Sequence, residues 1–148
     1  MSIFPTKVLL ATDGSVDARL AARTAADLAE STDSELHVLA VGRTFPSAVY
    51  EVYVEQAQDA LRQEAQQVLD DEVRKIEEDG GKVAQVHLKM GEERDEAIVH
   101  LAEEIDAGLI VMGSRGHGRI RRALMGSVSD SVVRHAECPV LIVRNRGH

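Results

Sequence analysis

Short apolar runs alternate with amphipathic stretches along the whole chain. The amphipathic stretches carry apolar residues at the three- and four-residue spacing of one helix face. The apolar runs have the length of strands and cover residues 7–12, 35–41, 83–90, 109–112 and 139–144. The predicted helices lie between them, at residues 15–31, 50–79, 92–107 and 127–136. The pattern therefore predicts strict alternation of strands and helices.

This alternation predicts a single α/β domain over residues 1–148, built as an open five-stranded parallel sheet with helices on both faces. The run Leu109–Met112 is apolar throughout, as in a central strand, whereas residues 83–90 alternate between apolar and polar, as at a sheet edge. We expect the strand order 3-2-1-4-5. Ligands of such sheets bind beyond the carboxyl ends of the strands, where the strand order reverses.

Charge and composition exclude several classes of protein. The net charge of -8 over 148 residues argues against nucleic-acid binding, because the phosphate backbone selects basic surfaces. We expect no membrane insertion, since no apolar run approaches the roughly 20 residues of a spanning helix. The single cysteine, Cys138, fits a reducing compartment, and a first strand beginning at Lys7 leaves no room for a signal peptide. We expect a cytoplasmic protein.

The loop after the fourth predicted strand concentrates glycine and positive charge. Four arginines and one histidine lie between Gly113 and Gly126, with no acidic residue among them. Glycines allow close backbone approach to a ligand, and Gly126-Ser127 opens a helix whose free N–H groups favour an anion. A capped surface loop with solvated arginines is the plainer interpretation. The position after a central strand favours a bound polyphosphate.

Other chemistries lack their residues. The loop contains no Walker sequence, and Arg121 stands where a dinucleotide fingerprint needs its third glycine. The histidines show no metal-binding spacing, so we expect no dedicated metal site. A phosphoacceptor receiver domain shares the alternation of elements, but the third strand ends in Met90-Gly91 rather than an acceptor aspartate.

The spacing Gly113-x2-Gly116-x9-Gly126-Ser127 resembles the ATP-binding signature of universal stress proteins. The segment Ala11–Ser15 looks like the opening motif of that family, and Cys138–Val143 looks like its closing strand. Length and element order also agree, so the resemblance covers the whole chain. It implies an ATP-binding protein of stress response or regulation.

The resemblance also implies roles for individual residues. Asp13 would accept hydrogen bonds from the ribose, and the backbone of Val41 would contact adenine. Arg115 and the neighbouring arginines could neutralise phosphate charge, and the pattern does not fix which of them does so. Mg²⁺ could arrive with ATP, and Asp13 is the nearest candidate ligand. The phosphates would be lined by Gly113, Gly116, Gly126, Ser127 and Ser129. The expected site also includes the flanking residues Thr12, Met112 and Val128. Each position has a plainer explanation, such as a turn for Asp13, a core position for Val41 or a helix cap for Ser127.

Three functions remain open at the level of sequence. A nucleotide-dependent switch is favoured, because no residue is evident as the base or water-positioning group that hydrolysis requires. The alternatives are a slow ATP hydrolase, and a family member that binds no nucleotide and acts as a dimeric interaction module. Val140–Val143 is apolar on both faces at a predicted sheet edge, which predicts a homodimer through this strand. The resemblance implies the same dimer and, beyond it, a regulated protein partner that the sequence does not identify.

Overall fold

The computed structural model describes residues 2–44, 51–115 and 125–145. Strands and helices alternate through these residues as the sequence predicts. In chain order the elements are β1 (Lys7–Thr12), α1 (Val16–Ser31), β2 (Glu35–Arg43), α2 (Glu51–Glu78), β3 (Gln85–Gly91), α3 (Arg94–Ile105), β4 (Leu109–Gly113), α4 (Ser127–His135) and β5 (Val140–Val143).

The five strands form one parallel sheet in the order β3-β2-β1-β4-β5, which confirms the predicted topology. The central strand β1 pairs with β2 on one side and with β4 on the other. Ala11 stands opposite Leu39 of β2 and Met112 of β4, so the carboxyl ends of these three strands meet at one edge of the sheet.

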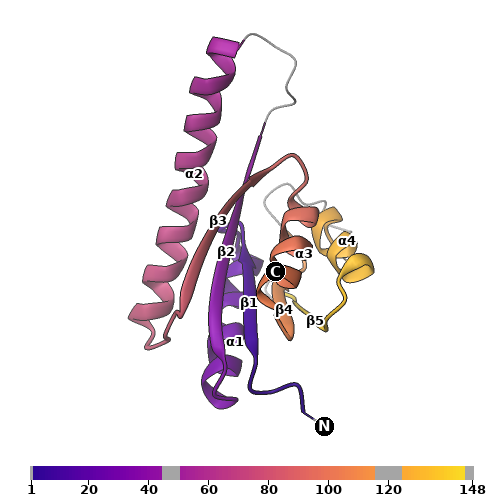
Figure 1. Ribbon diagram of the computed structural model, residues 1–148. Helices are drawn as coiled ribbons and strands as arrows, with labels where there is room; N and C mark the ends of the chain where they lie inside the picture. Colours follow the sequence, from indigo (N-terminus) through magenta and orange to yellow (C-terminus); the bar gives the residue numbers. More distant parts are fainter. Residues whose placement is uncertain (1, 45–50, 116–124, 146–148) are drawn as a thin grey trace.

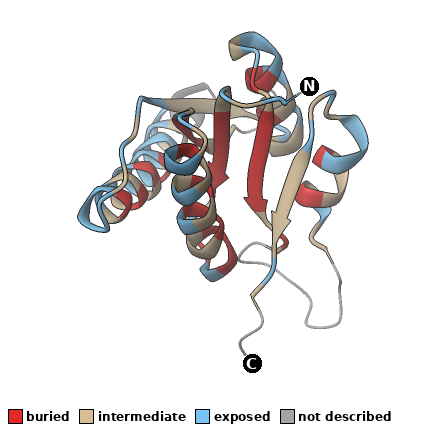
Figure 2. Ribbon diagram, turned by 90° about the horizontal axis from the view of Figure 1, so that it is seen from below, coloured by how far each residue is buried: buried red, intermediate tan, exposed pale blue. Residues whose placement is uncertain are grey.

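Helices cover both faces of the sheet (Figure 1). Along β1, Val8 and Leu10 point into one apolar cluster and Leu9 points into the other, because successive side chains of a strand face opposite ways. Helices α1 and α2 complete the first cluster, and α3 and α4 complete the second. Figure 2 shows that the buried residues concentrate in the central strands and on the helix faces turned toward them.

Helix α2 is the longest element, and its first turns extend beyond the end of the sheet (Figure 1). Its inner face is anchored by Ala65, Leu69 and Ile76, which are at most 7% exposed. No helix among the described residues is both long and apolar enough to span a membrane.

Some element boundaries differ from the sequence prediction. Strand β2 continues to Arg43, two residues beyond its predicted end, because Gly42 and Arg43 pair with Met90 and Gly91 of β3. Strand β3 begins at Gln85 rather than at residue 83, because its pairing with β2 starts with Gln85 opposite His37. The remainder of the predicted loop after β2 falls largely in residues 45–50, outside the described residues.

Two histidines meet across β2 and β3, although their spacing in the sequence gives no sign of a pair. His37 Nδ1 lies 3.0 Å from His87 Nε2, and His37 Nε2 lies 3.3 Å from a carboxylate oxygen of Glu35. Burial, followed by the neighbouring His37 and Lys89, lowers the pKa of His87. Among the described residues, no group of three potential ligands is arranged to hold a metal ion.

Candidate functional site

A cavity of about 590 Å³ lies at the carboxyl ends of the central strands. Here β1 continues into α1, which leads to β2 on one side, and β4 precedes α4, which leads to β5 on the other. The connections that follow the neighbouring strands β1 and β4 therefore run toward opposite edges of the sheet. Open α/β sheets place their ligands at such a point.

The cavity gathers the predicted site residues. All of those that the structure describes line it: Thr12, Asp13, Val41, Met112, Gly113, Arg115, Gly126, Ser127, Val128 and Ser129. Gly116 lies outside the described residues, as do the arginines at 119, 121 and 122. The structure therefore brings these segments together around one cavity. Their individual roles toward a ligand remain predictions.

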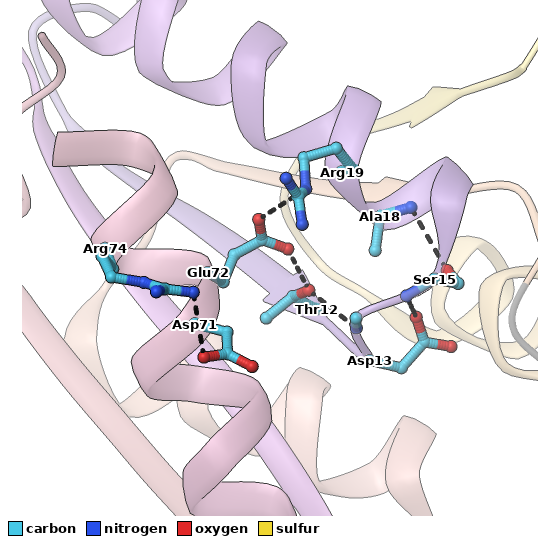
Figure 3. Close-up of polar contacts among 9 residues, drawn as sticks. Thr12, Asp13, Ser15, Ala18, Arg19, Asp71, Glu72 and Arg74 are labelled. Carbon is cyan, nitrogen blue, oxygen red and sulfur yellow. Dashed lines mark hydrogen bonds and ion pairs between the residues drawn. The ribbon is translucent and has the colours of Figure 1, made fainter. Parts of the chain in front are cut away.

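The turn between β1 and α1 is fixed by its own side chains (Figure 3). Gly14 adopts φ +79°, which glycine reaches without steric cost, and its N–H donates to the Thr12 hydroxyl at 3.1 Å. Asp13 accepts the Ser15 N–H at 2.9 Å, and the Ser15 hydroxyl caps α1 by accepting the Ala18 N–H at 3.3 Å. Asp13 thus organises the turn and also lines the cavity.

Gly113 lets the end of β4 approach α1 closely. A Cβ atom at this position would lie 2.7 Å from the backbone carbon of Asp17 and 2.9 Å from the backbone nitrogen of Ala18. Any side chain larger than hydrogen would push the strand end away from the helix. Gly113 therefore allows β4 and α1 to pack closely, and it also lines the cavity.

A buried carboxylate lies beneath the start of the glycine-rich loop. Asp17 is 1% exposed, and its Oδ2 accepts the Ser114 hydroxyl at 2.7 Å and lies 3.8 Å from Nε of Arg115. Asp17 Oδ1 has no hydrogen-bond partner among the residues that the structure describes. Part of the Arg115 charge is therefore balanced by Asp17, and the backbone of this loop is tied to the first turn of α1.

Helix α4 begins at the cavity, and no side chain among the described residues caps its N-terminus. Its N-cap is Gly126, which has no side chain to accept the N–H groups of the first turn. Ser127 is exposed at this end, while the Ser129 hydroxyl is buried and directed at the carbonyl oxygens of Ser114 (2.7 Å) and Gly126 (3.1 Å). An uncapped helix N-terminus presents partial positive charge and free donors to an anion. Ser129 instead holds the helix against the end of β4.

A second buried carboxylate reaches the site from α2. Glu72 is 2% exposed, accepts the Thr12 hydroxyl at 2.6 Å, and lies 3.4 Å from Nε of Arg19 (Figure 3). Burial raises the pKa of the Glu72 carboxyl, an effect that the Thr12 hydrogen bond and the Arg19 charge oppose. Because the folded protein then holds the proton more tightly than the unfolded chain does, Glu72 stabilises the fold less as the pH rises through this raised pKa.

Several lining residues were not predicted from the sequence. Arg43, Glu64 and Arg94 come from β2, α2 and α3 and form part of the wall. The predicted end of β2 left Arg43 outside the strand, and Glu64 read as part of a solvated helix face. Ser114 lies within the quoted loop, but nothing in its type or spacing distinguished it from its neighbours. The remaining unpredicted lining residues are Ala11, Ser15, Ala18, Leu39 and Ile98.

The structure is that of an α/β protein with a cavity at the carboxyl ends of its central strands. The family model described as the universal stress protein family matches residues 5–144, and the chain belongs to this family. It is 36% identical over 139 residues to a universal stress protein of Staphylococcus aureus strain USA300, a match that covers 93% of this chain and 82% of that one.

Two solved structures extend the comparison. The hypothetical protein MJ0577 superimposes with a TM-score of 0.84 at 26% identity, over 98% of this chain and 99% of that one. A universal stress protein from Archaeoglobus fulgidus, in complex with dAMP, superimposes with a TM-score of 0.64 at 26% identity, over 96% and 97% of the two chains. The family is therefore established by sequence and fold together.

Proposed function

We propose that this protein binds ATP in the cavity at the ends of β1, β2 and β4, and that it acts as a nucleotide-dependent switch in a cytoplasmic stress or regulatory response. The observation that carries the proposal is that Asp13, the described ends of the glycine-rich loop (residues 113–115 and Gly126) and the start of α4 meet around one cavity. The dAMP complex of the Archaeoglobus fulgidus relative supports an adenine nucleotide as the ligand.

The cavity residues fit the parts of ATP in a definite order. Gly126 and Ser127 begin α4 and Gly113 ends β4 at the same cavity, which suits the phosphates. The Asp13 carboxylate suits the ribose hydroxyls or a Mg²⁺ ion carried by the phosphates, and the end of β2 at Val41 suits the adenine. Bound Mg²⁺ would offset phosphate charge, whereas the chain itself would supply the backbone donors.

We favour nucleotide binding over hydrolysis because few carboxylates of the cavity wall could serve as a general base. Among the described lining residues, the carboxylates are Asp13 and Glu64, and Asp13 already accepts the Ser15 N–H. A general base must reach the attacking water directly. Slow hydrolysis is the second candidate, and Glu64 is the carboxylate that it would have to use.

Mg-ATP is expected to raise the thermal stability of the nucleotide-free protein. At 100 times its dissociation constant, a ligand that binds only the folded state adds about 2.7 kcal/mol, which raises Tm by roughly 5–10 °C for a domain of this size. Thermal unfolding with Mg-ATP, with Mg-GTP as the comparison nucleotide, measures the effect. An unchanged Tm with every adenine nucleotide would contradict the proposal and favour a dimeric module that binds no nucleotide.

We further propose a homodimer formed through β5. Residues Val140–Val143 form an edge strand whose only sheet neighbour among the described strands is β4, and all four residues are partly exposed. Pairing with the same strand of a second chain would satisfy this edge and bury its apolar side chains. Light scattering at micromolar concentration should give twice the mass of 16.1 kDa. A monomeric mass would contradict the dimer, and Leu141→Lys should convert a dimer to monomer.

A further inference from the structure

Glu72 does not belong to the wall of the cavity, yet it makes a short hydrogen bond to a residue that does. It lies on the inner face of α2, one helical turn from the buried Leu69 and Ile76. Its Oε1 accepts the hydroxyl proton of Thr12 at 2.6 Å, while Thr12 lines the cavity at the end of β1. The contact links α2 to the proposed ligand site across 60 residues of sequence.

The hydrogen bond to Glu72 leaves the Thr12 hydroxyl available only as an acceptor. A hydroxyl has one proton, so Thr12 can only accept from its other neighbours once that proton is donated to Glu72. It accepts the N–H of Gly14 at 3.1 Å, and this contact holds the turn in which Gly14 has φ +79°. Asp13 lies between these two residues. The carboxyl of Glu72 is therefore connected, through the Thr12 hydroxyl, to the turn that carries Asp13.

Charged groups from three parts of the chain surround the Glu72 carboxyl. The charged groups that act on the carboxyl are Arg19 of α1, Lys75 of α2 and Asp13 of the turn. Arg19 is close enough to Glu72 Oε2 for an ion pair, at 3.4 Å, but the two atoms are not aligned as a hydrogen bond. Thr12 is thus the one hydrogen-bond donor to this side chain among the described residues.

We propose that Glu72 is a positioning residue of the nucleotide site, acting through the Thr12 hydroxyl on the turn that presents Asp13. This inference rests on the proposed function. It also gives α2 a part in ligand binding, because any displacement of α2 from the sheet would release Thr12. Nucleotide affinity and the packing of the long helix are therefore coupled.

A double-mutant cycle tests this coupling through the dissociation constant for Mg-ATP. Glu72→Leu removes the acceptor and puts an apolar side chain of similar size in its place. The Arg19 side chain, which is 32% exposed, has to turn its charge to solvent for this variant to fold. Glu72→Leu and Thr12→Val should each weaken binding about tenfold, the loss of one hydrogen bond to a charged group. The double variant should be no weaker than either single variant, because Glu72 acts only through Thr12.

Two further variants separate positioning from general stability. Glu72→Gln keeps an acceptor for Thr12 and should bind within about threefold of the wild type. Asp71→Asn is the matched control on the same helix, since the Asp71 side chain is 43% exposed and paired with Arg74 at 3.2 Å (Figure 3). It should leave the affinity unchanged.

The outcomes distinguish this inference from the proposed function. Wild-type protein that fails to bind Mg-ATP overturns both. Wild-type binding with Glu72→Leu equally tight, or with losses that add in the double variant, overturns the positioning role alone. A second readout is hydrogen exchange at the Gly14 amide, which should be faster in Glu72→Leu than in the wild type. Unchanged exchange at Gly14 would also overturn the inference.

Discussion

Gly113→Ala is expected to lower the free energy of unfolding by about 3 kcal/mol, the upper part of the range for overpacked positions. The new Cβ would lie 2.7 Å from backbone and side-chain carbons of Asp17. These atoms belong to the first turn of a helix and cannot rotate away as the end of a flexible side chain would. Relief therefore requires β4 and α1 to separate, and this separation also opens the proposed phosphate site. Denaturant unfolding monitored by circular dichroism measures the loss.

Gly91→Ala is the matched control for this change. Gly91 also ends a strand, but a Cβ there would meet its nearest atoms at 3.8 and 4.0 Å, which is ordinary van der Waals contact. The expected change in stability is within about 0.5 kcal/mol. Equal losses in the two variants would contradict the close approach of β4 to α1.

Leu69→Ala is expected to cost about 3 kcal/mol, within the range for truncating a buried leucine. Leu69 is 2% exposed and belongs to the apolar cluster between the sheet and helices α1 and α2. Its loss leaves a cavity under the helix that also carries Glu72. For a domain of this size the change should lower Tm by roughly 6–12 °C. Thermal unfolding of the nucleotide-free protein gives this value.

Leu61→Ala provides the comparison on the same helix. Leu61 lies about two turns closer to the N-terminus and is only partly buried. Because less apolar surface returns to water, its truncation should cost less than half as much as Leu69→Ala. A larger loss at Leu61 than at Leu69 would mean that α2 is anchored by its first turns and not by the segment beside β1 and β2.

The fold could be predicted from the sequence because each element carries its own periodicity. Strand β1 was predicted with its observed bounds, since an apolar run ends in Asp13-Gly14 and the turn needs the positive φ of Gly14. The ends of β2 and β3 were less accurate. They are set by pairing between two strands, seen in Arg43 opposite Gly91, and no single segment contains that information.

The sequence predicts the site residues that lie in contiguous loop segments. It does not predict those whose position depends on how the helices pack on the sheet. The loops after β1 and β4 are contiguous segments with a recognisable spacing, so Asp13 and Gly126 were identified. Glu72 and Asp17 were not, because their burial results from the way α2 and α1 dock on the sheet. A glutamate on a polar helix face gives no sign in the sequence that it will meet a threonine hydroxyl.

The contact between Glu72 and Thr12 changes how the family signature should be understood in this chain. The described signature residues Gly113, Gly126 and Ser127 line the cavity, and residues outside the signature contact the segments that carry the lining. Asp17 ties down Ser114 at the start of one loop, and Glu72 holds Thr12 at the start of the other. Each of the two loops is therefore hydrogen-bonded to a buried carboxylate that does not line the cavity.

The central claim is tested most directly by titrating nucleotide-free protein with Mg-ATP in a calorimeter, with Asp13→Ala measured alongside. We expect saturable binding of one nucleotide per chain, and an affinity that falls about tenfold in Asp13→Ala, the loss of one hydrogen bond to a charged group. Absence of binding by ATP, ADP and AMP to folded, nucleotide-free protein would contradict the account. Binding with undiminished affinity in Asp13→Ala would contradict the position proposed for the ribose.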